Sequence, residues 1–291
     1  MAVAPEDLNP PLTSEDWRLV GLDIDGTLMH WGGEITDAVA DAVTQVRLSR
    51  NHVVLATGRN IVATMPVAQR LGIRRGWAVC SNGAVTIRLN PGSPGGYDIV
   101  RALTFNPRAA LELIRDEMPD VFFAVEDLGV GFRVTKEFPM GELVGRQRVV
   151  AFEELCHDDV TRVVIRAPGA DVSHFDAIVQ RIGLSDVTYA VGYSAWLDLT
   201  PPGVSKASAL EDLREELGVH PEHTVTVGDG NNDIEMLRWA RDSYAMGNSP
   251  ERVVLAANAV VGPVDEDGVL DVLLSLADPA RLVGDGPRLD G

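Results

Sequence analysis

Cysteine and long apolar runs are both scarce in this sequence of 291 residues. Its two cysteines can form neither a disulfide framework nor a cysteine-based zinc site. No stretch approaches the ~18 continuous apolar residues that a membrane-spanning helix needs. The N-terminal segment has neither a basic start nor an apolar run, so we expect no signal peptide. We therefore expect a cytoplasmic protein without a membrane partner.

Basic side chains are also few, because 25 Lys and Arg stand against 43 Asp and Glu, a formal net charge of −18. A chain this acidic has no overall attraction for nucleic acids, so we expect no nucleic-acid partner. Only two of the basic residues are lysines, Lys136 and Lys206, and all the others are arginines. Each lysine therefore needs its own explanation. The hydrophobic content of 45% excludes a disordered chain, and the length predicts about two domains.

Short apolar runs alternate with helix-like segments toward both ends of the chain. The predicted strands are residues 18–24, 52–59, 77–83 and 223–229. The predicted helices are residues 36–49, 60–72 and 206–217. Strands that alternate with helices are joined by right-handed crossovers, which produce a parallel sheet with helices on both faces. The pattern therefore predicts an α/β fold with a doubly wound, Rossmann-like core.

The middle of the chain has a different pattern. The Pro/Gly-rich loop NPGSPGG lies between two apolar runs, which predicts a hairpin, and paired strands interrupted by single helices follow. This pattern is typical of an α+β unit with an antiparallel sheet. We therefore expect two domains, a core formed by residues 1–85 and 199–291 and an inserted α+β domain over residues 86–198.

A pair of aspartates follows the first predicted strand. Asp23 and Asp25 stand in the run DIDGT, and the alternation of side chains along a strand puts both on the same side. Two carboxylates at a strand end repel each other unless a cation lies between them or one is protonated. Mg²⁺ prefers oxygen ligands of this kind, and a protonated carboxyl can act as a general acid. The alternative is an Asp-rich turn without chemistry.

A second acidic run, GDGNND, follows the predicted strand over 223–229. Asp229 and Asp233 can bring carboxylates to the same edge of the sheet as the first pair, and open α/β sheets bind ligands at this edge. Neither acidic run has the glycine of an EF-hand loop at its sixth position. Asp233 replaces the third glycine of a dinucleotide fingerprint, and no P-loop occurs. An acidic edge suited to Mg²⁺ remains.

Two further positions could contact a phosphate. Thr57 and Gly58 follow a predicted strand in the run ATGR, where a hydroxyl and backbone N–H groups suit a phosphate oxygen. The alternative for Thr57 is an ordinary helix N-cap. Lys206 begins a predicted helix, and a lysine in an arginine-rich chain indicates a need for a compact point charge. Its alternative is a solvated helix lysine, as we expect for Lys136.

Together, these motifs resemble those of the haloacid dehalogenase superfamily of aspartate-nucleophile phosphohydrolases. The runs DIDGT, ATGR and GDGNND are similar to its first, second and fourth motifs, and Lys206 to its third, in the same order. The runs SNGA and DLTPPGVSK resemble the Cof-type branch, in which a large (C2-type) cap is inserted after the second motif. The resemblance covers about residues 18–275 and implies an α/β core with an α+β cap.

The resemblance also implies roles for individual residues. Asp23 would be the nucleophile, Asp25 would protonate the leaving oxygen and later activate water, and the Mg²⁺ ligands would be Asp23, Asp25 and Asp229. The residues implied to bind the phosphoryl group of the substrate are Thr57, Gly58, Lys206 and Asn232. The supporting residues would be Asp233, Asn82 and Gly83.

The function implied by the resemblance is that of a Mg²⁺-dependent phosphatase, a phosphoric monoester hydrolase that acts on a small phosphorylated metabolite such as a sugar phosphate through an aspartyl-phosphate. One alternative is a phosphomutase of the phosphomannomutase type, which would need a second phosphate site in the cap, where Arg133 and Arg166 could supply it. Another is a non-catalytic phospholigand-binding protein, which the presence of both Asp23 and Asp25 disfavours. No feature of the sequence indicates an oligomeric state.

Overall fold

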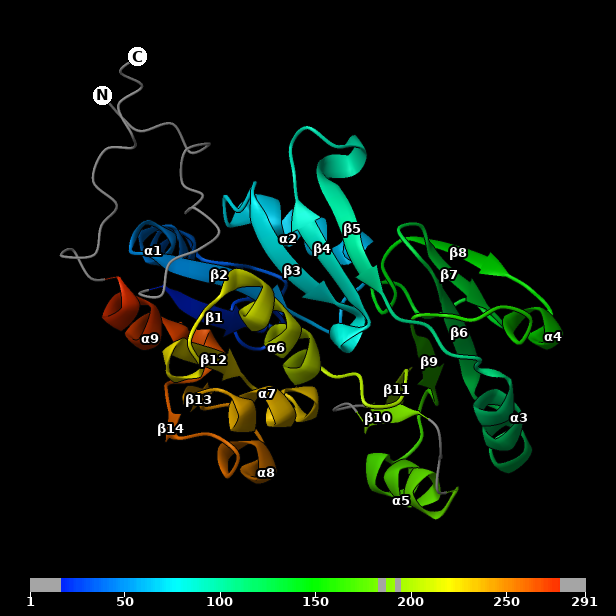
Figure 1. The fold of residues 1–291 in the computed structure, drawn as a ribbon. Helices are drawn as coiled ribbons and strands as arrows, with labels where there is room; N and C mark the ends of the chain where they lie inside the picture. The colour runs from blue at the N-terminus through cyan, green and yellow to red at the C-terminus, as the bar shows by residue number, and fades with distance from the viewer. Residues whose placement is uncertain (1–16, 183–186, 192–194, 278–291) are drawn as a thin grey trace.

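The computed structural model describes residues 17–182, 187–191 and 195–277, which form two β-sheets with helices packed against them (Figure 1). One sheet has eight strands in the order β14-β13-β12-β1-β2-β3-β4-β5, and the other has six in the order β10-β11-β9-β6-β7-β8. The first sheet comes from both ends of the described chain and the second from the segment between them. The predicted α/β core with an inserted α+β unit is thus confirmed. We call the two units the core and the cap.

The core sheet is parallel over six of its strands. These are β1 (Arg18–Leu22), β2 (Asn51–Ala56), β3 (Gly76–Cys80), β12 (Thr224–Gly228), β13 (Asp242–Ala245) and β14 (Ala259–Val260). The central strands are buried along their length because helices cover both of their faces. The predicted hairpin is confirmed as β4 (Val85–Leu89) and β5 (Tyr97–Ala102), which pair in antiparallel orientation and extend the sheet beyond β3.

Helices cover both faces of the core sheet. One face carries α1 (Asp37–Leu48), α2 (Ile61–Arg70) and α9 (Val269–Leu276). The opposite face carries α6 (Lys206–Leu217) and α7 (Ile234–Trp239), and α8 (Glu251–Val254) packs near β13. The predicted start of α1 is confirmed, because the Thr36 side chain accepts a hydrogen bond from the Val39 N–H at 3.2 Å. No helix in the described ranges is long and apolar enough to cross a membrane.

The cap is a six-stranded sheet with helices on one face. Its strands are β6 (Phe122–Asp127), β7 (Gly131–Val134), β8 (Arg146–Val149), β9 (Val163–Arg166), β10 (Thr188–Val191) and β11 (Trp196–Thr200). Its helices are α3 (Arg108–Glu117), α4 (Phe152–Leu155) and α5 (Val172–Ile182). The apolar sides of α3 and α5 pack on one face of the sheet. The other face carries aromatic side chains, among them Phe132 and Trp196.

Two details of the cap differ from the sequence prediction. The hairpin β4–β5 belongs to the core sheet, so we propose that the cap begins after Ala102 rather than at residue 86. The reason is that β4 pairs with β3 in antiparallel orientation. The alternation of strands and helices in the sequence predicts only the parallel strands of the core sheet, so it does not indicate this neighbour. The cap sheet is also not wholly antiparallel, because β8, which has no apolar alternation, pairs with β7 in parallel.

The packing of α6 on β1 leads to a stability prediction. Leu210 is fully buried, and its Cδ1 would lie 2.9 Å from a Cβ added to Gly21 of β1. We expect Leu210→Ala to lower the free energy of unfolding by about 2–5 kcal/mol in urea titration, because it leaves a cavity against the sheet. The matched control is Leu274→Ala on α9, where the leucine is 62% exposed, and we expect a change within ~0.5 kcal/mol. Equal losses in the two variants would contradict this packing.

Candidate active site

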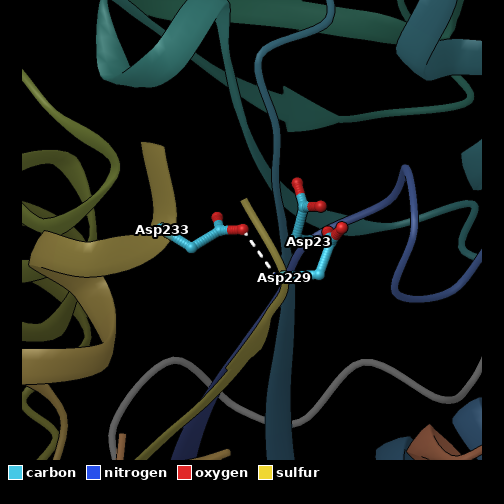
Figure 2. A group of neighbouring side chains, drawn as sticks. All are labelled: Asp23, Asp229 and Asp233. Atoms are coloured by element: carbon cyan, nitrogen blue, oxygen red, sulfur yellow. Dashed lines mark hydrogen bonds between the residues drawn. The ribbon is translucent and has the colours of Figure 1, made fainter. Parts of the chain in front are cut away.

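Three buried carboxylates meet at the carboxyl ends of β1 and β12. Asp23 and Asp229 follow these neighbouring strands, and the Asp23 N–H donates to the Val227 carbonyl at 3.0 Å. Asp233 lies in the short helical turn Asn231–Asp233 that precedes α7. One oxygen from each carboxylate lies within 4.8 Å of the others, so the group could hold a metal ion. Figure 2 shows Asp23 and Asp229 side by side, with Asp233 reaching toward the Asp229 backbone.

Lys206, the first residue of α6, lies within this acidic group and is fully buried. Its Nζ donates to Asp23 Oδ1 at 2.5 Å and to Asp233 Oδ1 at 2.6 Å. Burial by itself lowers the pKa of Lys206, but the charges of Asp23 and Asp233 raise it above its usual value. The ammonium group therefore stays charged. Lys206 is therefore not the solvated helix lysine that the sequence left open as the alternative.

The nucleophile candidate Asp23 has an unusual electrostatic environment. Burial, together with the carboxylate of Asp233, raises its pKa well above the usual value even though Lys206 lowers it. Three carboxylates face one ammonium group here, so the site has an excess of negative charge. A divalent cation between the carboxylates would offset this excess and favour the ionised form of Asp23.

Asp229 and Asp233 are held by hydrogen bonds from the loops around them. Asp233 Oδ2 accepts from the N–H groups of Asp229 and Gly230 at 2.9 and 2.8 Å. Asn248 Nδ2 donates to Asp229 Oδ2 at 3.2 Å and to the Gly26 carbonyl at 3.0 Å, which ties the two acidic loops together. The sequence reasoning missed Asn248. Its position shortly after β13, the next parallel strand along the sheet, is the signal that could have found it.

Asp25 does not point into the buried group. Both of its carboxylate oxygens accept from the Arg59 guanidinium, at 2.5 and 2.7 Å, and its side chain is 49% exposed. The sequence predicts Asp25 on the same side as Asp23, but β1 ends at Leu22, so strand alternation does not extend to Asp25. Asp233 is the third carboxylate of the buried group instead. Arg59 was missed as a site residue although it directly follows Thr57 and Gly58.

Four further predicted residues, Thr57, Gly58, Asn82 and Asn232, lie close to one another. Thr57 is buried at the end of β2, and its hydroxyl accepts from the Arg59 N–H at 3.1 Å. Asn232 Nδ2 donates to Asn82 Oδ1 at 2.9 Å. A Cβ on Gly58 would lie 3.0 Å from Asn82 Oδ1, so glycine leaves the space that this amide pair occupies.

A cavity of about 580 Å³ lies between the core and the cap. Its core lining includes Asp23, Asp25, Gly58, Arg59, Asn232 and Asp229. Its cap lining includes Phe132, Leu143, Arg162, Trp196 and Asp198. The candidate nucleophile therefore faces a space whose opposite wall comes from the cap, which can enclose a small molecule.

Comparison with known proteins identifies the family of this chain. The sequence profile of haloacid dehalogenase-like hydrolases matches residues 20–116 and 133–273, which is more than half of the chain. The chain belongs to this family. A relative from Bacillus subtilis, the 5-amino-6-(5-phospho-D-ribitylamino)uracil phosphatase YitU, is 27% identical over 267 residues, which cover 86% of this chain and 94% of the relative.

Two further similar proteins extend the comparison. A phosphoglycolate phosphatase from Methanoculleus marisnigri is 27% identical and covers 86% of this chain and 93% of its own. The structure of the subclass IIB sugar phosphatase BT4131 has a TM-score of 0.73 and 22% identity, covering 89% of this chain and 98% of its own. This structure shares the core and cap fold. The chain is a phosphoric monoester hydrolase of the Cof-type branch.

The surroundings of Lys206 lead to a prediction for activity. We expect Lys206→Arg to lower kcat/KM at least ~100-fold, because a guanidinium does not fit the buried space between Asp23 and Asp233 and cannot replace the point charge. The assay is hydrolysis of p-nitrophenyl phosphate with Mg²⁺, and circular dichroism checks the fold. Lys136 is the matched control, since it is exposed, and Lys136→Arg should stay within about twofold of wild type. A near-normal Lys206→Arg enzyme would make Lys206 a structural residue only.

Proposed function

We propose that this protein is a Mg²⁺-dependent phosphatase that hydrolyses a small phosphorylated metabolite, such as a sugar phosphate, through an aspartyl-phosphate on Asp23. One observation carries the proposal: Asp23, bound to Lys206 and beside Asp229, faces the cavity between core and cap. A fixed carboxylate beside a buried cation is suited to attack phosphorus, where negative charge develops on the transferred group.

The donor set of the acidic group fits Mg²⁺, which takes oxygen ligands and retains several waters. Asp233 already uses Oδ1 for Lys206 and Oδ2 for two backbone N–H groups, so Asp23 and Asp229 are the better carboxylate ligands. In this proposal Asp233 orients Lys206, and Asp25 is not a side-chain ligand. When bound, the metal would neutralise charge on the phosphoryl oxygens and act as a Lewis acid.

The residues of this chain divide the reaction into two steps. In the first, an Asp23 oxygen forms a bond to phosphorus while the bond to the leaving oxygen breaks, and Asp25 donates a proton to that oxygen. In the second, Asp25 takes a proton from water, which attacks phosphorus and releases Asp23 and phosphate. Asp25 has to free one oxygen from Arg59 for these transfers. Thr57, Gly58, Lys206 and Asn232 would hold the phosphoryl oxygens.

The cap favours a phosphatase over a phosphomutase. Arg133, a candidate for a second phosphate site, is bound to Asp127 at 2.9 Å and to Asp158 at 3.3 Å. Arg166, the other candidate, donates to both oxygens of Glu142 at 3.2 Å. A second phosphate would have to compete with these carboxylates, which weakens the tight binding of a bisphosphate that a mutase needs.

The lining of the cavity also supports a substrate whose leaving group is uncharged. Arg162 lines the cavity from the cap, but it is bound to Asp198 at 2.6 Å, so this ion pair carries no net charge. Phe132 and Trp196 provide aromatic surface beside it. A sugar or heterocyclic group can contact such a wall through ring faces and hydroxyl groups.

The nucleophile assignment predicts that Asp23→Asn lowers kcat to less than ~1% of wild type, because an amide is neither a comparable nucleophile nor an anionic metal ligand. The measurement is phosphate release with Mg²⁺, and thermal unfolding verifies that the variant is folded. Asp37→Asn is the control, because Asp37 is an exposed aspartate on α1, and its rate should not change. If the folded Asp23→Asn variant kept more than a few per cent of the rate, another residue would be the nucleophile.

The choice between hydrolysis and mutase chemistry predicts the fate of labelled water. With Mg²⁺ and hexose phosphates in ¹⁸O-labelled water, we expect released phosphate to carry one labelled oxygen, because water attacks the aspartyl-phosphate. Mass spectrometry of the phosphate measures the label, and chromatography follows the sugar phosphates. Conversion of the 1-phosphate to the 6-phosphate without comparable phosphate release would instead establish a phosphomutase.

A further inference from the structure

The turn that follows β3 is conformationally strained and buried. Ser81, Asn82 and Gly83 all have positive φ, at 50°, 54° and 103°, although two of them are not glycine. All three are buried, and a Cβ on Gly83 would overlap the Ser205 carbonyl oxygen. Non-glycine residues hold the left-handed conformation only where their surroundings compensate for it. The hydrogen bonds of this turn therefore show which residues stabilise its left-handed conformation.

Two carboxylates of the cap contact two successive residues of the turn. Ser81 Oγ donates to Glu126 Oε2 at 2.6 Å, and Asn82 Nδ2 donates to Asp198 Oδ2 at 3.3 Å. Glu126 comes from β6 and Asp198 from β11, so separate strands of the cap sheet supply them. We call these two hydrogen bonds the cap clasp.

The cap side of the clasp is rigidly supported. Glu126 is 4% exposed, and its Oε2 also accepts from the Thr161 hydroxyl at 3.0 Å. Asp198 Oδ1 is bound by Arg162, whose Nε and Nη2 lie 2.8 and 2.6 Å away. Burying a carboxylate costs free energy unless hydrogen bonds or charges compensate for it. Both hydrogen bonds that Glu126 accepts go to Oε2, and Oε1 has no partner among the described atoms.

The core side of the clasp leads to the phosphoryl site. The Asn82 N–H donates to the Thr57 carbonyl at 3.0 Å, and the Ser81 N–H donates to the Arg59 carbonyl at 2.8 Å. Asn82 Oδ1 accepts from Asn232, which lines the same cavity as Asp23. A displacement of the turn would therefore move Asn82, and with it the partner that orients Asn232.

We propose that Glu126 is a positioning residue for phosphoryl transfer. Through Ser81 it holds the turn in the conformation that places Asn82 and Asn232 beside the phosphoryl group, so the binding site is complete only while the cap is packed on the core. The role of Asn232 rests on the proposed function. The contact itself, from the cap through Ser81 to Asn82, rests on geometry alone.

The test is a double-mutant cycle measured on kcat/KM for p-nitrophenyl phosphate with Mg²⁺. We expect Ser81→Ala and Glu126→Ala each to lower kcat/KM about tenfold. The double variant should lose no more than the worse single variant, because every one of these variants removes the same Ser81–Glu126 hydrogen bond. Glu126→Gln keeps an acceptor oxygen and should stay within about threefold of wild type. Asp127→Asn, which alters the neighbouring cap carboxylate bound to Arg133, should stay within about twofold.

Additive losses of about 100-fold in the double variant, or folded single variants with wild-type rates, would overturn the proposal. Amide hydrogen exchange of the substrate-free protein supplies a readout that does not depend on turnover. Glu126→Ala should speed exchange over residues 81–84 and leave β1 unchanged, and Asp127→Asn should alter neither. Unchanged exchange over 81–84 would count against the clasp, whereas a wild-type protein that does not hydrolyse p-nitrophenyl phosphate would count against the proposed function.

Discussion

The buried ammonium group of Lys206 is the interaction on which the rest of the site depends. It joins the start of α6 to Asp23, 183 residues away in the sequence, and to Asp233, 27 residues away. An unexposed cation cannot be left unpaired without a large loss of stability, so these segments have to converge whenever the core is folded. The same constraint places a positive charge at one point of a chain whose net charge is −18. A local positive charge of this kind attracts an anionic substrate.

The core and the convergence of three acidic residues at one edge of its sheet could be predicted from the sequence because both follow from local rules. Apolar runs with intervening helix patterns specify parallel strands, and the carboxyl ends of such strands meet at one edge. This reasoning brings Asp23, Asp229 and Asp233 together, and the structure places them within 4.8 Å of one another. The scarcity of lysine drew attention to Lys206, whose side chain is fully buried and donates to two carboxylates.

The contacts that the sequence did not predict depend on how separate segments pack. Nothing local indicates that Arg59 binds Asp25, or that Glu126 reaches Ser81 from another domain 45 residues away. The strand β8 has exposed and polar residues, so it lacks the alternation that announces a strand. The sheet to which β4 and β5 belong could not be predicted for a related reason, because a hairpin has the same local pattern whether it joins one sheet or another.

The connection from the cap back to the core has a consequence for how such enzymes can diversify. The last cap strand ends at Thr200 and α6 begins at Lys206, so only residues 201–205 separate the substrate-facing sheet from the buried lysine. The outgoing connection after Ala102 instead leaves from an edge strand of the core sheet. We therefore expect an exchange of caps between relatives to be tolerated more easily at the outgoing junction than at the returning one, where a change in length or direction would displace the lysine that contacts Asp23.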